Sequence, residues 1–292
     1  MVAPLQFAPS SLAGFLIRRA LLNETLGNYF FWYVYVECNI KENEQSKLYV
    51  QIYRTFKYAL EHGSGDQQLR WSRLKQQRVF LAGLRNLTKE LKEKAGNRVK
   101  KIGILKTTLQ ENEGFTNIEP PMPLPLEPTV YTTGIDAGSA YMFKSALCPL
   151  LLKFKTTTGG TYSIIYKLGD DLRQDQLILQ LIMLMDKLLK KENLDLKLTP
   201  YQCLATSSEI GMLQCVPECE ALASVFKDYG NIRAFLKEKS PDPTQPTGIE
   251  REARDDYVKE LCGVLRHHLL ARDWRQAFRQ LNDHRKGPPL PH

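Results

Sequence analysis

The sequence lacks the features that would place it in a membrane or outside the cell. The aromatic cluster at 29–35 is far shorter than the roughly 20 apolar residues that cross a bilayer. Met1–Ser10 has no basic region followed by an apolar core and a cleavage site, so no secretion is predicted. The six cysteines form no C-x-x-C pair, and Cys215 with Cys219 alone does not predict a zinc site. We therefore expect a cytosolic protein with reduced thiols.

Positive charge is what the sequence has in excess. The net charge is +8 and the isoelectric point about 9.1, which favours an anionic partner: a membrane surface, nucleotide phosphates or nucleic acid. Much of this charge lies in 70–101, where a solvated helix face is the more ordinary interpretation. A chain of 292 residues with 43% hydrophobic and 25% charged content can hold one large globular domain or two of ordinary size.

The first hundred residues are predicted to be helical. Apolar residues recur at helical spacing over 12–26, and the pattern continues through 28–36. A second helix is expected over 48–60, stopped by Gly63-Ser64-Gly65, and a third from 71 to 91, ending near Gly96. The apolar faces of these helices must pack on each other or on a neighbour. There is no short internal repeat, although helix pairs of this kind also occur in solenoids.

A proline-rich segment at 119–128 separates the helices from a region with strand periodicity. Proline lacks the backbone donor and fixes φ, so we expect extended polyproline across a surface and a domain boundary there. Beyond it, 153–155 and 164–166 flank T-T-T-G-G-T, a hairpin signal. Further strands are expected at 194–198, 201–205 and 210–216, and helices at 221–226, 232–239 and 250–266. The fold class is therefore α+β.

One stretch, 162–185, indicates chemistry. A β-branched and aromatic run ends at Lys167, Gly169 breaks the strand, and Asp170 and Asp171 can cap a helix. The apolar residues that follow recur at helical spacing: Ile178, Ile182, Met185 and Leu189. A lysine at a buried strand end, facing Asp175 on the next helix, suits a phosphate-binding kinase lobe. Because a capped helix after a strand is common, this local pattern alone leaves a purely structural role open.

Longer runs carry a family resemblance. K-L-G-D-D-L-R-Q-D-Q, with E-N-L-D-L-K-L-T-P-Y, F-K-S-A-L-C-P and P-L-P-L-E-P, resembles the class III phosphatidylinositol 3-kinases, the vacuolar protein sorting lipid kinases, over roughly 10–263. The resemblance implies an α-helical accessory domain at 1–106, a proline-rich linker at 107–130, a kinase N-lobe and hinge at 131–217, and the helical start of a truncated C-lobe at 218–263. The N-lobe would consist of an antiparallel sheet with one main helix.

The resemblance also implies a substrate set and the residues that bind phosphates. The family uses ATP with magnesium or manganese to phosphorylate the inositol 3-hydroxyl of phosphatidylinositol. Residues 143–147 resemble its phosphate-covering loop, with Ser145 and Ala146 nearest the phosphates. Lys167 would neutralise the α/β-phosphates, Asp175 would orient Lys167, and Asp170 would lie beside them.

Adenine recognition and partners are implied in the same way. Gln214 and Val216, in the hinge-like strand 211–217, would present backbone groups to adenine, and Tyr201 would lie on the pocket wall. Cys215 replaces a residue that is usually aromatic in the family, which puts the pocket shape in doubt. The implied partners are phosphatidylinositol membranes, a protein-kinase-like regulatory subunit and a Beclin-type autophagy subunit, with no nucleic acid. The implied location is cytoplasmic, peripheral on endosomal and autophagic membranes.

Two family motifs are missing from the sequence. Neither the catalytic loop G-x-G-D-R-H-x-x-D-N nor D-F-G occurs, so no catalytic residue and no metal ligand is assigned. His267 and His268 are no substitute, since adjacent helical positions do not face one site. We expect negligible catalysis by this chain alone. The alternative is a non-catalytic interaction fragment that binds the kinase's regulatory partners. The class III-like runs disfavour a protein serine/threonine kinase or a 4-kinase.

The residues after Gly263 suggest a frameshift. Suitable synonymous codons for the chain from Val264 onward, read one nucleotide out of frame, give C-Y-V-I-T-Y-L-L-G-I-G-D-R-H-L-D-N-L, the missing loop in its required place. The codons are chosen, so the match demonstrates compatibility. The hypothesis is that 264–292 is an aberrant tail.

Overall fold

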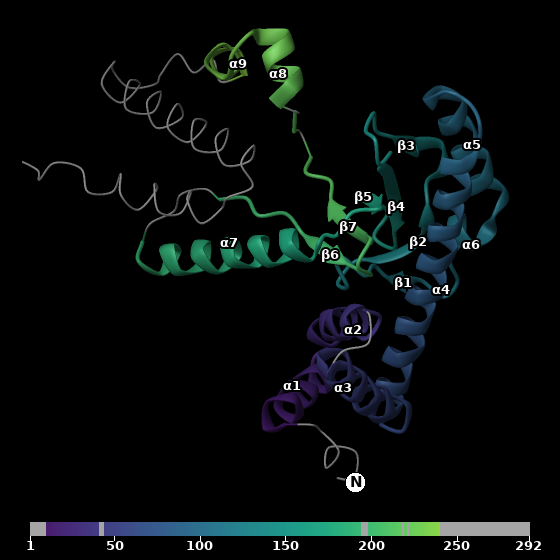
Figure 1. The fold of residues 1–292 in the computed structure, drawn as a ribbon, viewed down its shortest axis with the longest axis vertical. Helices are drawn as coiled ribbons and strands as arrows, with labels where there is room; N and C mark the ends of the chain where they lie inside the picture. Colours follow the sequence, from purple (N-terminus) through teal and green to yellow (C-terminus); the bar gives the residue numbers. More distant parts are fainter. Residues whose placement is uncertain (1–9, 41–43, 194–197, 218, 221, 240–292) are drawn as a thin grey trace, which may run out of the picture. The chain divides into compact units, whose positions relative to one another are not determined.

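The computed structural model describes residues 10–40, 44–193, 198–217, 219–220 and 222–239 (Figure 1). The chain divides into two compact units, Met1–Pro217 and Glu218–His292. In the second unit, α8 (Leu222–Tyr229) and α9 (Ile232–Lys239) contact each other, with the rings of Tyr229 and Phe235 edge to face at 5.2 Å. These helices confirm the first two of the three predicted after 220. All candidate site residues lie in the first unit.

The first unit begins with packed helices. α1 (Ser11–Leu22), α2 (Glu24–Cys38) and α3 (Glu44–Glu61) contact one another, and α4 (Gly65–Glu93) packs on α3. The pattern predicted to continue from 12 to 36 is interrupted at Asn23, whose extended backbone ends α1 and whose side chain accepts the Leu26 N–H of α2 at 2.8 Å. A capping box between Ser64 and Gln67 starts α4.

Two helices follow where the sequence predicted none, α5 (Arg98–Glu111) and α6 (Glu113–Thr116). Asn97 caps α5 by accepting the Lys100 N–H at 3.0 Å. Along α5 only Leu105 and Leu109 are buried. Two buried residues four positions apart give too little periodicity to be recognised in a sequence.

A seven-stranded antiparallel sheet completes the first unit. Its order is β1-β2-β4-β5-β7-β6, with β3 pairing on β4. The strands are β1 (Met122–Pro123), β2 (Tyr131–Ile135), β3 (Tyr141–Met142), β4 (Leu150–Thr156), β5 (Thr161–Leu168), β6 (Cys203–Ala205) and β7 (Ile210–Gln214).

This sheet confirms the α+β class and most of the predicted strands. The predicted hairpin is β4 and β5, and α7 (Arg173–Lys191) is the predicted main helix. The sheet also has β1, β2 and β3, which no strand pattern indicated. Residues 194–197 of one predicted strand and the helix expected at 250–266 lie outside the described residues.

The proline-rich segment does not run across a surface, as the sequence had predicted. Met122, Leu124 and Leu126 are completely buried, and β1 within the segment pairs with β2. The apolar residues that alternate with the prolines therefore belong to the core. The sequence argument considered only the backbone of proline and overlooked these side chains. The domain limits assigned at 106 and 130 remain predictions, since helices and sheet lie in one compact unit.

Side-chain amides of the helices satisfy the carbonyl groups of this segment. Gln77 of α4 is completely buried and donates from Nε2 to the Pro123 carbonyl and to Asn28 Oδ1, both at 2.9 Å. Its Oε1 accepts the Trp32 indole N–H at 2.9 Å. Asn28 donates in turn to the Pro125 carbonyl at 2.8 Å. Every polar atom of Gln77 is thus engaged, as burial requires.

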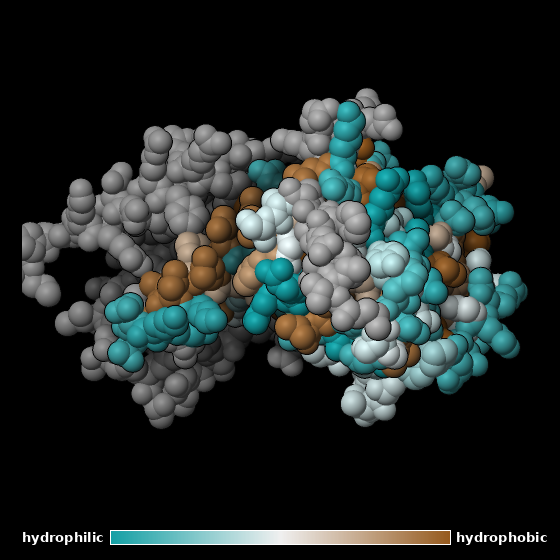
Figure 2. All heavy atoms as spheres, turned by 90° about the horizontal axis from the view of Figure 1, so that it is seen from below, coloured by the Kyte–Doolittle hydropathy of each residue, from teal (hydrophilic) through white to brown (hydrophobic). Residues whose placement is uncertain are grey.

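One continuous hydrophobic core joins the helices to the sheet. Phe80 of α4 packs edge to face on Phe115 of α6 at 5.6 Å and lies 5.9 Å from the ring of Phe154 of β4. The core does not extend along α7, where Leu179 alone is fully buried. Figure 2 shows apolar surface gathered along α7, and the exposed apolar residues there are Leu177, Leu181, Met183, Leu184 and Leu188.

Replacing Gln77 by alanine is expected to lower the free energy of unfolding by about 2–4 kcal/mol, because Trp32, Asn28 and the Pro123 carbonyl would lose a buried partner. Gln76→Ala is the matched control: Gln76 makes one exposed bond, to the Pro120 carbonyl, and should cost less than about 1 kcal/mol. Urea unfolding of both variants measures the difference. Equal losses would contradict a structural role for the Gln77 network.

Candidate functional site

The two faces of β5 have different environments. Ile164, Tyr166 and Leu168 are buried, whereas Ile165 and Lys167 alternate with them and are half-buried. Successive side chains of a strand point to opposite faces, so Lys167 lies on the face that the core does not cover. The sequence therefore holds this lysine at a sheet surface that a ligand can reach.

An apolar row crosses this open face next to Lys167. Ile165 of β5 is directly opposite Leu151 of β4 and Leu213 of β7, and all three are half-buried. Lys167 itself is opposite Gly211. A Cβ at Gly211 would lie 2.7 Å from Leu172 Cδ1, so glycine is required for the buried Leu172 to pack there. The open face thus presents a row of apolar side chains with the cation of Lys167 beside it.

The ammonium group of Lys167 is paired with Asp170. Its Nζ lies 2.9 Å from Asp170 Oδ2, with 25% and 35% of the two side chains exposed. Asp175, which the family resemblance assigns to Lys167, lies exposed in the first turn of α7. Within the described residues no ion pair joins Lys167 to Asp175. The structure brings Lys167 and Asp170 together, and the binding roles assigned to Asp170 and Asp175 stay predictions.

Tyr201 and Cys203 lie within the electrostatic reach of these charges. Burial, and then the Asp175 charge, raises the pKa of the Tyr201 hydroxyl, while Lys167 opposes the rise. Burial likewise raises the pKa of the Cys203 thiol to about 12, with Asp175 adding to the shift. Tyr201 was predicted on the pocket wall, and the charges of Asp175 and Lys167 act on its hydroxyl group. Cys203 was missed, because a single cysteine in a strand gives no sequence signal.

The turn after Lys167 is held by groups far apart in the sequence. Gly169 has φ +94°, and its N–H donates to the Glu209 carbonyl at 2.7 Å. A Cβ on Gly169 would lie 3.3 Å from Leu147, so the turn lies against the 143–147 loop. From α4, Lys92 donates to the Leu168 carbonyl at 2.7 Å, and burial lowers the pKa of this lysine. Sequence reasoning missed Lys92, whose partner is 76 residues away.

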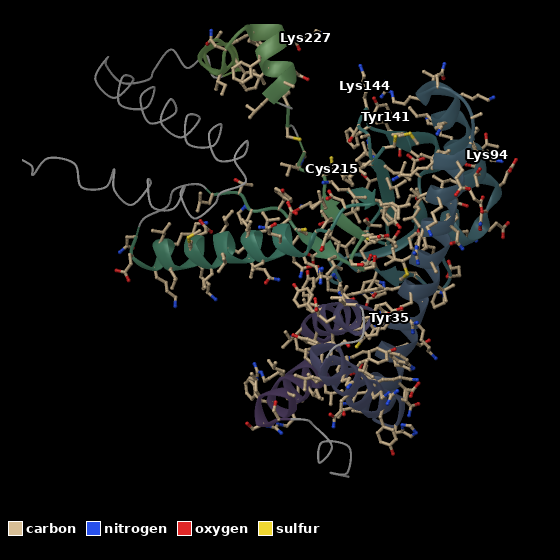
Figure 3. The ribbon with its side chains drawn as sticks, in the orientation of Figure 1. Tyr35, Lys94, Tyr141, Lys144, Cys215 and Lys227 are labelled. Carbon is tan, nitrogen blue, oxygen red and sulfur yellow. The ribbon has the colours of Figure 1, made fainter. Side chains whose placement is uncertain are left out.

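The 143–147 loop is exposed and internally braced. Ser145 N–H donates to the Phe143 carbonyl and Cys148 N–H to the Ser145 carbonyl, both at 3.1 Å. Cys148 has φ +47°, a strained conformation for a residue with a side chain. Figure 3 shows Lys144 near Tyr141 at the end of β3, pointing away from the sheet. Ser145 and Ala146 are exposed, so their backbone groups can be reached by a ligand.

The hinge-like strand leaves selected backbone groups open. The Gln214 N–H donates to the Gln202 carbonyl, and the Cys215 N–H donates to the Ser163 carbonyl, both at 2.9 Å. The Val216 N–H makes no hydrogen bond with any part of the chain that the structure describes. Val216 therefore offers a donor beside the open face, whereas Gln214 has only its carbonyl to offer.

Helix α7 is attached to α2 of the helical bundle. Arg173 is paired with Asp171 at 2.7 Å and with Glu37 of α2 at 3.3 Å. Gln180 donates to the Tyr33 hydroxyl. These contacts position the first turn of α7, which carries Asp175. Asp171 accepts the Arg173 N–H at 3.1 Å, but Leu172 occupies the cap position, so the predicted capping by Asp170 and Asp171 is only partly right.

The described residues do not provide a metal centre. No group of three or more histidine, cysteine, aspartate or glutamate side chains among them is placed to hold a metal ion. Asp170 is occupied by Lys167. The donor set present therefore does not fit a magnesium or manganese site.

No helix within the described ranges is long and apolar enough to span a membrane.

Comparison with known proteins agrees with this geometry. Residues 161–270 match the family "Phosphatidylinositol 3- and 4-kinase". The chain is 40% identical over 262 residues to phosphatidylinositol 3-kinase pik3 of Schizosaccharomyces pombe, and 39% identical over 262 residues to phosphatidylinositol 3-kinase VPS34 of Arabidopsis thaliana. The Saccharomyces cerevisiae VPS34 is 37% identical over 260 residues. The matches cover 87–88% of this chain and 28–32% of the relatives.

The antiparallel sheet, its lysine and the following helix are those of a kinase N-lobe, and the family match makes the chain a relative of the lipid kinases. Within them it is related to the class III phosphatidylinositol 3-kinases, which confirms the resemblance seen in the sequence. The chain spans about a third of the length of the curated relatives it matches.

Cys203 should be alkylated slowly by iodoacetamide, because only the thiolate reacts and its pKa is raised to about 12. We expect its rate in the folded chain to keep rising about tenfold per pH unit beyond pH 9. In the chain unfolded with urea, the rate should level off near about pH 9, as for an unperturbed thiol. Mass spectrometry of the modified peptide measures both. A plateau near pH 9 in the folded chain would contradict the burial of Cys203.

Proposed function

We propose that this chain is the nucleotide-binding part of a phosphatidylinositol 3-kinase, which transfers phosphate from ATP to the inositol 3-hydroxyl of phosphatidylinositol. The observation that carries the proposal is the open face of the sheet, where Lys167 lies two residues along β5 from the centre of the row Leu151–Ile165–Leu213. A row of apolar side chains suits contact with a purine base, and a cation beside that row suits the phosphates. Relatives named as phosphatidylinositol 3-kinases supply the reaction type and lipid.

Each predicted residue has a defined task in this proposal. The ammonium group of Lys167, held by Asp170, is oriented toward the α/β-phosphates, and Asp175 stabilises its charge once a nucleotide is bound. Backbone groups of Ser145 and Ala146 cover the phosphates. The Gln214 carbonyl and the Val216 N–H bind the two edges of adenine, with Tyr201 beside the pocket.

Nucleotide binding is the step that these residues support, and phosphoryl transfer requires more. Transfer needs a proton acceptor and metal ligands at the phosphates. The sequence has neither family loop, and the described residues include no metal-holding cluster. We therefore propose that the chain binds ATP and is catalytically inactive alone, and that the complete enzyme uses magnesium or manganese held by residues outside this chain.

Lys167→Met should weaken ATP binding about 10- to 100-fold, the usual effect of removing a hydrogen bond to a charged group. The Lys167–Asp170 pair is partly exposed, so its loss should change the free energy of unfolding by at most about 1 kcal/mol. Lys89→Met is the control, an exposed lysine of the helix α4 and not of the sheet. Fluorescence titration with a labelled ATP analogue measures the affinity. Equal weakening in both variants would contradict the proposed site.

A second candidate function is a non-catalytic interaction fragment. It is favoured by the missing catalytic motifs and by the intact helical bundle, and its partners would be the family's protein-kinase-like regulatory subunit and Beclin-type subunit. Its setting would be endosomal trafficking and autophagy on the cytoplasmic side of membranes. Nucleotide binding separates the candidates, because both predict an inactive chain: binding of the labelled ATP analogue that Lys167→Met weakens would favour the nucleotide-binding part, and no such binding would favour the fragment.

The origin of the tail is part of this proposal. The family match ends at residue 270, and the frameshift hypothesis begins at Val264. Sequencing the transcript around Gly263 tests it. A second frame that encodes G-D-R-H is expected, and a second frame without that motif would exclude the frameshift.

A further inference from the structure

A hollow of about 420 Å³ lies between the loop after β3 and the start of α5. It is lined by residues of the 142–148 loop and by Gly96, Arg98 and Lys101. Lys167, Asp170 and Asp175 do not line it. The hollow therefore shares a loop with the candidate nucleotide site and is distinct from the charged groups that define that site.

The charges around the hollow all have one sign. Arg98, Lys101 and Lys144 line it, and no carboxylate does. Arg98, Lys100 and Lys101 stand in the first turn of α5, which contains no acidic residue. A helix N-terminus already carries about half a positive charge, so acidic residues are the ones that stabilise this position. Arg98, Lys100 and Lys101 repel one another and the positive helix end, and an anion bound among them would offset this repulsion.

Two of the cations are fixed in place by the backbone around them. Arg98 donates from Nη1 to the Met142 carbonyl at 3.2 Å and to the Tyr141 hydroxyl, and its guanidinium lies 5.4 Å from the centre of the Tyr141 ring. Lys101 donates to the Lys92 carbonyl at 2.8 Å. Arg98 Nε and Nη2 make no hydrogen bond with the described residues, and Lys101 has two N–H groups left. Arg98 and Lys101 therefore present further N–H donors at the wall of the hollow.

The third cation can move to meet a ligand. Lys144 is exposed, and no hydrogen bond or ion pair engages its side chain within the described part of the chain. Figure 3 shows it near Tyr141, the residue of β3 that precedes the lining residue Met142. One mobile ammonium group and two fixed cations are suited to closing around a small anion.

We propose that this hollow, the α5 basic hollow, binds a phosphate group through Arg98, Lys101 and Lys144. A guanidinium group matches two phosphate oxygens at once, and ammonium groups neutralise the remaining charge. The group can belong to a soluble phosphate or to a phosphomonoester lipid headgroup. Tyr141 and Val99, next in sequence to the lining residues Met142 and Arg98, are 38% and 73% exposed, which suits contact with a lipid surface. The proposal does not depend on nucleotide binding at Lys167.

The test uses the full 292-residue chain and two probes. Calorimetric titration with inorganic phosphate, at constant ionic strength set by chloride, reports soluble phosphate. Sedimentation with phosphatidylcholine vesicles, with and without phosphatidic acid, reports a phosphomonoester headgroup. The variant Lys101→Gln/Lys144→Gln removes two cations, and the single variant Lys144→Gln changes a side chain with no structural contact. Lys89→Gln, an exposed lysine of α4 that does not line the hollow, is the matched control.

The double variant should bind phosphate or phosphatidic acid vesicles at least about tenfold more weakly than the unmodified chain. Lys144→Gln should show part of this loss with an unchanged Tm, and Lys89→Gln should bind normally. An effect confined to calorimetry assigns the hollow to soluble phosphate, and one confined to vesicles assigns it to a lipid headgroup. Lys167→Met should leave phosphate and vesicle binding unchanged while weakening ATP binding. The proposal is overturned if no phosphate or vesicle binding depends on Lys101 and Lys144.

Discussion

The inability of proline to donate a backbone hydrogen bond is the constraint on which the first unit depends. The carbonyls of the proline-rich segment find their donors in side chains of α2 and α4, chiefly the buried amides of Gln77 and Asn28. These bonds fix the segment against the helices and so place β1 beside β2. Because β2 pairs with β4 and β4 with β5, the strand that carries Lys167 is ultimately positioned by the helices.

The same arrangement explains why only one face of the sheet is open to a ligand. Side chains such as Tyr166 on one face are buried in the core shared with α4, which leaves the alternate residues uncovered. The alternating geometry of a strand then assigns Lys167 and Ile165 to the accessible side. The accessible surface around Lys167 therefore results from the packing of the opposite face of the sheet.

Local patterns predicted the long helices and the strands from β4 onward, and they missed α5, α6, β1, β2 and β3. They also failed where structure depends on distant partners. The strand ending at Lys167, its turn and the helix after it follow from period changes and glycine punctuation. Burial of the proline-rich segment and the bond from Lys92 to the Leu168 carbonyl depend on residues 40 or more positions apart, which no local pattern encodes. The motif resemblance indicated the loop, the lysine and the hinge. It gave no indication of Cys203, and it assigned Lys167 to Asp175, whereas the structure pairs Lys167 with Asp170, which the resemblance had only placed beside them.

The attachment of α7 to α2 through the Arg173–Glu37 pair has a consequence for how such proteins can be divided. The predicted boundary between accessory helices and kinase lobe lies within one compact unit, Met1–Pro217. A lobe expressed from residue 107 would keep the apolar side chains Leu124 and Phe154 without their cover, and α7 without its brace. Transplanting this lobe into a relative would require moving the helices with it, so the two parts are expected to be exchanged together.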